Sequence, residues 1–119
     1  MQATQQPFEF KIHSRQGANP GQRVIEMTGP LLITTMFPLR EALRAGDENA
    51  TILDFTNVPF MDSAGLGLLV QAQVSSQRAG RLFAFAGMNE RVRTVFSVTH
   101  VDGLFSFYLT AAEAEAALV

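Results

Sequence analysis

The fold is decided by residues 57–69, which read Asn57-Val58-Pro59-Phe60-Met61-Asp62-Ser63-Ala64-Gly65-Leu66-Gly67-Leu68-Leu69. Before this stretch, residues 51–56 are mostly apolar, as is typical of a strand covered on both faces in a parallel sheet. After it, apolar residues recur at helical spacing, which predicts a helix from Ser63 to near Gly80. The expected buried face of that helix holds Leu66, Leu69, Val70 and Val74. Because residues 81–86 predict a second buried strand, the segment is a βαβ unit with an expected right-handed crossover.

The chain before this unit predicts two strands and a helix. Alternation of apolar and polar residues indicates a strand at 7–13, and a loop rich in Gly, Asn and Pro returns the chain into a strand at 23–28. These two strands are expected to pair in antiparallel fashion. Thr35 is expected to N-cap a helix that has Pro38 in its first turn and ends at Gly46.

The chain after the βαβ unit predicts two more helices and a last strand. Asn89 is expected to cap a helix with Val92, Val95 and Phe96 facing inward, and a strand is expected at 104–109. The sequence from Thr110 to Glu113 matches a capping box that opens a terminal helix. The prediction is therefore an α/β fold, a mixed five-stranded sheet with about four helices, in a single domain spanning residues 1–119.

Composition excludes several classes of protein. The chain has 119 residues, a net charge of −2 and no cysteine, which excludes disulfides, thiolate metal sites and a cysteine nucleophile. A single lysine, Lys11, and scattered arginines offer no basic stripe for nucleic acid. No apolar run approaches the ~20 residues of a membrane span, and residues 1–7 do not resemble a signal peptide. We therefore expect a soluble cytoplasmic protein with no nucleic-acid partner and no direct membrane insertion.

Ser63 is the residue with the clearest chemical potential. It lies where a strand and loop lead into a helix, at the carboxyl end of the predicted sheet, where open α/β folds tend to place ligands. One interpretation is an N-cap, in which the hydroxyl accepts a backbone N–H. A phosphate added there would face the positive end of the helix dipole. Gly65 and Gly67 each cost the helix roughly 0.5–1 kcal/mol relative to Ala, which favours close approach by another backbone or molecule.

A serine hydrolase is a poor match to this sequence. A nucleophile built from Ser63 with His13 or His100 would need a glycine two positions earlier, but Met61 stands there. The histidines are more simply explained by a strand end and a loop, so no catalytic residue is predicted.

Nucleotide and metal sites are equally weak interpretations. Val70 stands where a Gly-x-Gly-x-x-Gly motif would place its third glycine, and no Gly-Lys-Ser/Thr element is present. Asp54, Asp62 and Glu90 come from separate elements, which is a weak pattern for a divalent cation. We therefore predict no cofactor and no metal.

Five segments together resemble the STAS domain of bacterial anti-sigma factor antagonists. They are residues 52–55, 60–67, 80–87, 92–96 and 110–114, with Asp-Ser-Ala-Gly-Leu-Gly at 62–67 as the core of the motif. The resemblance implies that Ser63 is phosphorylated by a serine kinase of the histidine-kinase-like ATPase type, which is also the anti-sigma factor. It further implies that the unphosphorylated protein binds this kinase, that phosphorylation releases it, and that a phosphatase acts on phospho-Ser63.

The expected partner surface surrounds that serine. It comprises Asp62, Ser63, Ala64, Gly65, Gly67, Gln71 and Arg78. One segment departs from the family pattern, because members often carry Gly-Glu-Leu-Asp where this chain has Gly29-Pro30-Leu31-Leu32, followed by Ile33. If the missing aspartate orients the serine or the nucleotide-bound partner, phosphotransfer is slowed or lost. A second hypothesis is therefore a constitutive STAS module of a transporter or signalling scaffold, which uses the same face without phosphorylation.

Overall fold

Five strands form one mixed sheet in the computed structural model, which describes residues 9–119. They lie side by side in chain order: β1 (Lys11–Gln16), β2 (Gln22–Thr28), β3 (Ala50–Asn57), β4 (Leu82–Ala86) and β5 (Phe107–Tyr108). The β1 strand pairs antiparallel with β2, while β2, β3, β4 and β5 pair parallel to one another. The predicted mixed five-stranded sheet is confirmed.

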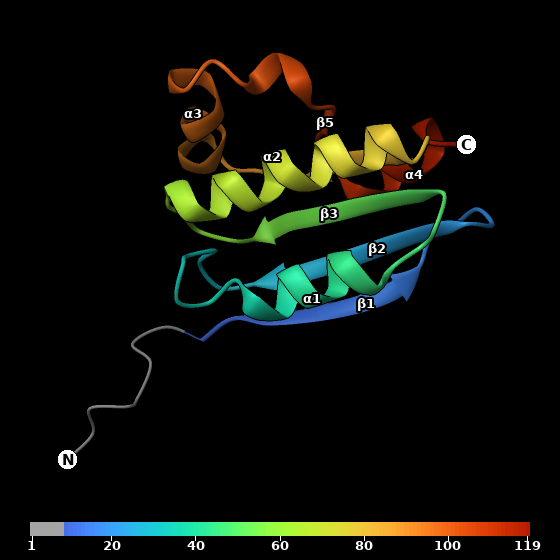
Figure 1. Ribbon diagram of the computed structural model, residues 1–119, viewed down its shortest axis with the longest axis horizontal. Helices are drawn as coiled ribbons and strands as arrows, with labels where there is room; N and C mark the ends of the chain where they lie inside the picture. The colour runs from blue at the N-terminus through green and yellow to red at the C-terminus, as the bar shows by residue number, and fades with distance from the viewer. Residues whose placement is uncertain (1–8) are drawn as a thin grey trace.

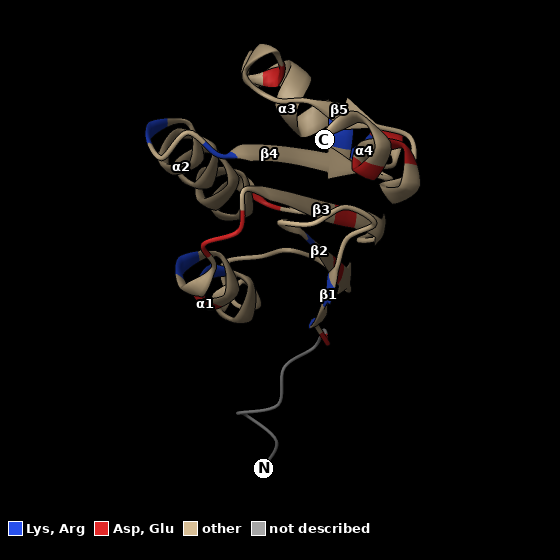
Figure 2. Ribbon diagram, turned by 90° about the vertical axis from the view of Figure 1, so that its right-hand side faces the viewer, with Lys and Arg blue, Asp and Glu red and all other residues tan. Residues whose placement is uncertain are grey.

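Helices cover both faces of this sheet (Figure 1). They are α1 (Phe37–Ala45), α2 (Ser63–Arg78), α3 (Glu90–Val98) and α4 (Ala111–Ala117), with a short 3₁₀ turn at Asp102–Leu104. The first three helices pack on one face and α4 packs on the other, as the end-on view in Figure 2 shows for α1, α2 and α4. In the part of the chain described, no helix is both long and apolar enough to cross a membrane.

Alternate residues of the central strands supply the two cores. On β3, Leu53 and Phe55 face the cluster shared with α1, α2 and α3, whereas Ile52 faces α4. Phe85 of β4 is fully buried in the larger cluster, with ring centroids 5.5 Å from Phe55. The remaining aromatic contacts of Phe85 join it to Phe83, Phe96, Phe105 and Phe107. These phenylalanines therefore pack together in the larger core.

The two outer strands differ from their predicted ranges. The expected strand at 7–13 begins only at Lys11 and runs on to Gln16, and residues 7 and 8 lie outside the described part. The strand continues beyond residue 13 because Arg15 lies opposite Val24 of β2 and forms an ion pair with Glu26. Pairing with β2 therefore sets the end of β1, although the alternation of apolar and polar residues stops earlier. The strand expected at 104–109 is reduced to Phe107–Tyr108, because the chain before it forms the 3₁₀ turn.

The start of α1 also differs from the prediction. Thr35 does not cap the helix, which begins at Phe37 after a Met36 N-cap that makes no side-chain hydrogen bond. Instead, the Thr35 hydroxyl donates to the carbonyl of Pro30 at 2.7 Å and accepts from the N–H of Leu32 at 2.8 Å. The hydroxyl therefore closes the turn that precedes the helix. The predicted helix end at Gly46 is confirmed.

The other predicted caps are present. The Asn89 side chain accepts from the N–H of Val92, and the Thr110 hydroxyl accepts from the N–H of Glu113. The Glu113 carboxylate reaches back to the N–H of Leu109 at 3.2 Å, one residue before the position that a capping box prescribes.

The buried face of α2 is rotated from the predicted one. Leu66 and Leu69 are buried as expected, but Val74 is 40% exposed. The face is completed instead by Gly65 and Leu68. Gly65 lets the helix approach the preceding chain closely, since a Cβ there would lie 2.8 Å from the carbonyl oxygen of Leu31.

Candidate functional site

Ser63 is the first residue of α2 and is exposed at the carboxyl end of the parallel strands. The chain leaves β3, makes a single parallel bridge between Met61 and Leu31, and enters the helix directly afterwards. Figure 1 shows the start of α2 beside the arrowhead of β3. The predicted position of Ser63 at a strand-to-helix junction is confirmed.

Asp62, and not Ser63, is the N-cap of α2. Asp62 has an extended backbone, and its Oδ1 accepts a hydrogen bond from the N–H of Gly65 at 2.9 Å. Its second oxygen, Oδ2, accepts from the N–H of Ile33 at 3.0 Å. A carboxylate has two acceptor oxygens, so Asp62 both caps the helix and holds the turn before α1. The N-cap interpretation of Ser63 is therefore wrong.

The Ser63 hydroxyl is left available by this arrangement. Within residues 9–119 it makes no hydrogen bond, and the helix behind it is 16 residues long. The free N–H groups of the first turn give that end of α2 a partial positive charge. A group transferred to Ser63 would therefore meet solvent on one side and a helix N-terminus on the other.

The two glycines of the motif have different surroundings. Gly65 is buried against Leu31, so its missing side chain serves helix packing. A Cβ at Gly67 would meet no atom within 4 Å, and the residue is exposed. Only Gly67 leaves a bare helix turn beside Ser63.

The remaining expected surface residues follow the same helix. Ala64 is half-buried, while Gln71 and Arg78 are exposed. At 100° per residue, Ser63, Gly67, Gln71 and Arg78 fall within about 80° of arc around α2. The structure thus brings these four residues onto one exposed strip of the helix.

Two exposed apolar side chains lie in the turn before α1 and at the start of α1, and they were not predicted from the sequence. Ile33 is 68% exposed in the turn held by Asp62, and Phe37 is 63% exposed at the start of α1. Large exposed apolar side chains beside a functional group are common in protein interfaces. The one signal in the sequence was the departure at Leu32, where the family often has an aspartate, followed by the apolar Ile33.

The loop before Ser63 is held in place by α3. Asn89 donates from Nδ2 to the carbonyl of Pro59 at 3.1 Å, and the Arg91 guanidinium lies 4.7 Å from the centre of the Phe60 ring. Such cation–π contacts contribute about 0.5–1 kcal/mol at exposed sites. The loop that leads to Ser63 is therefore held by α3 as well as by the turn that contains Ile33.

The structure does not assemble the rejected enzymatic or metal sites. Neither His13, on β1, nor His100, after α3, hydrogen-bonds Ser63 in the part of the chain described. Asp54 accepts from the Thr56 hydroxyl at 2.6 Å. No group of three or more metal-ligating side chains is found among residues 9–119.

The fold and this junction define a small α/β domain of the STAS type. The family model described as the STAS domain matches residues 13–114, and the chain belongs to that family.

Relatives and solved structures agree with that membership. A protein from Thermotoga neapolitana, named as an anti-sigma factor antagonist homologue, is 36% identical over 66 residues, 56% of this chain and 58% of its own length. The matched region thus spans little more than half of that relative.

Solved structures match more of the chain at lower identity. An anti-sigma factor antagonist from Mycobacterium paratuberculosis shares the fold with a TM-score of 0.82 at 21% identity, covering 92% of this chain and 94% of that one. The Bacillus cell fate determinant SpoIIAA in its phosphorylated form has a TM-score of 0.71 at 20% identity, covering 92% and 100%.

Proposed function

We propose that this protein is an anti-sigma factor antagonist that switches partners through phosphorylation of Ser63. Unphosphorylated, it binds an anti-sigma factor that is a serine kinase of the histidine-kinase-like ATPase type, in the cytoplasm. Phosphorylation releases the kinase and a phosphatase resets the switch. The observation that carries the proposal is the exposed Ser63 hydroxyl, left unbonded because Asp62 caps α2.

The names of the relatives support this proposal. The Thermotoga neapolitana relative carries an antagonist name, and the Bacillus structure is of a phosphorylated form. The proposed binding surface joins the exposed strip of α2 to Ile33 and Phe37.

Phosphorylation would change the charge of this surface without unfolding the domain. The phosphate adds ~1.5–2 negative charges beside the carboxylate of Asp62. The N-terminus of α2 partly compensates that charge within the domain, but a partner seated on the surface would have to accommodate it. The domain should therefore stay folded while the partner leaves.

The test begins with the kinase recovered by pull-down from native cytoplasm. Incubation with that kinase and ATP should add one phosphate, located by mass spectrometry at Ser63. Ser63→Ala should abolish the modification, whereas Ser75→Ala, an exposed serine on the same helix, should not. Phosphate mapped to Thr34, Thr35 or Ser75 would contradict the assignment.

A second measurement tests the switch itself. Circular dichroism of the phosphoprotein should match that of the unmodified protein, while affinity for the kinase should fall at least tenfold, about 1.4 kcal/mol. Equal affinity of both forms would instead support a constitutive module.

The constitutive module is the second candidate, and one observation favours it. Leu32 stands where the family often has an aspartate, and Ile33, which follows it and donates its N–H to Asp62, is an exposed apolar residue and not an acid. A pull-down that recovers a transporter component, with no phosphate ever found on Ser63, would support this candidate.

A further inference from the structure

A cavity of the described chain lies between α1 and α2, away from Ser63. It has a volume of about 620 Å³ and reaches Thr51 and Leu82, near the starts of β3 and β4. It therefore opens toward the amino ends of the parallel strands, whereas Ser63 lies at their carboxyl ends. Ser75, on its α2 wall, is about 18 Å along the helix axis from Ser63 at 1.5 Å per residue.

Positive charge is concentrated in this cavity. Arg23, Arg40, Arg44 and Arg81 line it. They are four of the nine Lys and Arg residues in a chain whose net charge is −2. Glu48 is the one acidic residue of the lining, so the lining has a formal charge of 4 − 1 = +3. Such a concentration in an acidic protein favours an anionic ligand.

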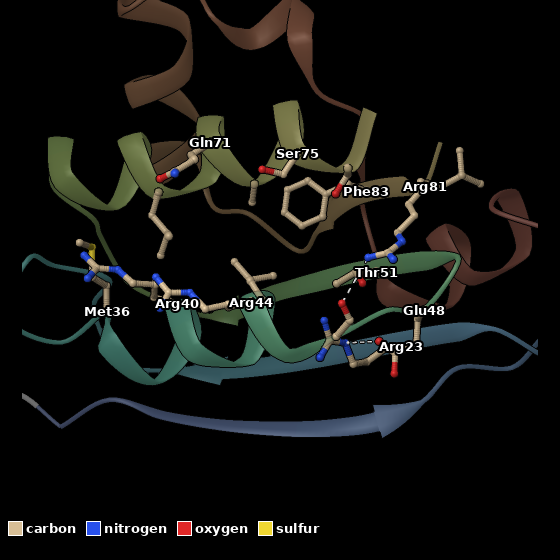
Figure 3. Close-up of a pocket in the computed structure, with 16 residues that line it drawn as sticks. Arg23, Met36, Arg40, Arg44, Glu48, Thr51, Gln71, Ser75, Arg81 and Phe83 are labelled. Atoms are coloured by element: carbon tan, nitrogen blue, oxygen red, sulfur yellow. Dashed lines mark hydrogen bonds and ion pairs between the residues drawn. The ribbon is translucent and has the colours of Figure 1, made fainter. Parts of the chain in front are cut away.

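Two of the arginines form a fixed end of the cavity. Arg23 donates from Nη1 to the carbonyl of Ala42 at 2.9 Å. Arg81 donates from Nη1 to the carbonyl of Gly46 at 3.3 Å (Figure 3). The Arg23 side chain is 13% exposed, and its Nε lies 3.2 Å from Glu48 Oε1 without hydrogen-bond geometry. These guanidinium groups are positioned by the fold and retain unused N–H donors.

The other two arginines have almost no internal partners. Arg40 makes no hydrogen bond or ion pair within residues 9–119, and Arg44 lies 3.8 Å from Glu41 in an exposed pair. Exposed pairs of this kind contribute little. Figure 3 shows both side chains along the α1 edge of the cavity, across from Gln71 of α2. Their donors are available to a ligand.

Apolar side chains form the floor beneath these charges. Leu68 and Phe83 are 9% and 5% exposed, and Met36 is 8% exposed at the other end. Small-molecule sites have volumes of about 300–1,000 Å³, with apolar walls and a few convergent polar groups. A ligand that matches this lining carries one anionic group and an apolar body.

We propose that the cavity between α1 and α2 binds a small amphiphilic anion, with a carboxylate or phosphate held by Arg40, Arg44 and Arg81 and an aliphatic body over Leu68 and Phe83. This site does not include Ser63, although Gln71 of α2 both lines the cavity and belongs to the proposed partner surface. Its binding is measured on the isolated protein without any kinase.

The test uses soluble probes that separate the two parts of the ligand. Octyl phosphate and octanoate should bind with measurable heat in isothermal titration calorimetry and shift the amide NMR signals of residues lining the cavity. Inorganic phosphate alone and octanol alone should each bind at least about tenfold more weakly. Equal binding of inorganic phosphate and octyl phosphate would overturn the assignment of an apolar subsite.

Matched variants locate the probe. Ser75→Glu places a negative charge inside the cavity and should weaken octyl phosphate binding at least about tenfold. Gln77→Glu adds the same charge on an exposed position of α2 outside the lining and should leave binding within about twofold. If both variants bind like the parent protein, the site is elsewhere and the proposal fails.

The arginines are tested in the same way. Arg40→Gln and Arg44→Gln, both at exposed positions, should each weaken binding several-fold, whereas Lys11→Gln on β1 should not. Urea unfolding of each variant checks that the fold is retained.

A membrane source for the anion is tested with vesicles. Phosphatidylglycerol vesicles are added at a lipid concentration equal to the octyl phosphate concentration that saturates the protein. Under these conditions the protein should not sediment with the vesicles. Arg40-dependent sedimentation without binding of either monomeric probe would overturn the proposal in favour of a lipid surface.

Discussion

The carboxylate of Asp62 accepts the backbone N–H of Ile33 at 3.0 Å and so joins the start of α2 to the turn before α1. The same carboxylate caps α2 through the N–H of Gly65. One side chain therefore positions both halves of the proposed partner surface.

Removing the Asp62 carboxylate should destabilise the domain. Asp62→Ala leaves the N–H groups of Gly65 and Ile33 without their acceptor and should lower the free energy of unfolding by about 1–2 kcal/mol in urea. Asp47→Ala is the control, since Asp47 is exposed and makes no hydrogen bond in the described chain. Equal stability of the two variants would show that the cap contributes nothing measurable.

The exposed apolar residues of the proposed partner surface, Ile33 and Phe37, should contribute to binding and not to stability. Ile33→Ser and Phe37→Ser remove side chains that are 68% and 63% exposed, so urea unfolding should change by less than about 0.5 kcal/mol. Affinity for the kinase should fall by more than about 1 kcal/mol in at least one of them. The matched control is Val98→Ser on α3, which is 66% exposed. An equal loss of affinity in the control would remove Ile33 and Phe37 from the interface.

The ion pair between Arg15 and Glu115 should make stability depend on pH. Arg15 contacts both oxygens of Glu115 at 3.1 and 3.2 Å, and the N–H of Ala18 donates to Oε1 at 2.7 Å. The hydrogen bond from Arg15, followed by the one from Ala18, holds the pKa of Glu115 below its usual value despite burial. The charged form is thus favoured in the folded state.

The sign of the pH effect follows from that lowered pKa. Stability from Glu115 is present above the pKa of the unfolded chain and is lost as the pH falls through the lower pKa of the folded protein. Glu115→Gln should therefore destabilise the domain at pH 7, and the difference from the parent should shrink in acid. The same difference at pH 7 and at pH 3 would contradict this account. Glu113→Gln, at an exposed position on the same helix, is the control.

Sequence patterns were sufficient to predict the central strands, the helix between them and two helix caps, because burial or a local hydrogen bond determines each of these elements. The strands around Leu53 and Phe85 are mostly apolar because they are covered on both faces, and the helix between them must cross over. The Asn89 and Thr110 caps were predictable because each side chain meets the N–H three residues later.

Elements decided by tertiary contacts were not predictable in the same way. Thr35 and Ser63 both had the chemistry of an N-cap, but neighbouring residues took that role, since the Thr35 hydroxyl bonds to Pro30 and Asp62 reaches Gly65. The cavity between α1 and α2 also gave no local signal, because its four arginines come from three separate segments of the chain. The exposed position of Ser63 at the start of α2 could be predicted because the motif around it is contiguous in the chain.

The glycines at 65 and 67 should respond in opposite ways to substitution. A side chain at Gly67 meets open space, so Gly67→Gln should raise the free energy of unfolding by roughly 0.5–1 kcal/mol through better helix propensity. Gly65→Ala puts a Cβ 2.8 Å from the backbone oxygen of Leu31, so helix and turn must separate and stability should fall by about 1–3 kcal/mol. Both changes are measured by urea unfolding.

The affinity of the Gly67→Gln variant for the kinase then tests whether Gly67 lies in the partner interface. If the partner packs on the bare turn beside Ser63, Gly67→Gln should weaken binding at least tenfold although the domain is more stable, because the new side chain occupies the partner's place. Gln77→Glu, on an exposed turn nearer the end of α2, serves as the control and should bind normally. A Gly67→Gln protein that is more stable and binds with unchanged affinity would show that the partner does not contact this turn, and the proposed surface would then be confined to Ser63 and the Ile33 side.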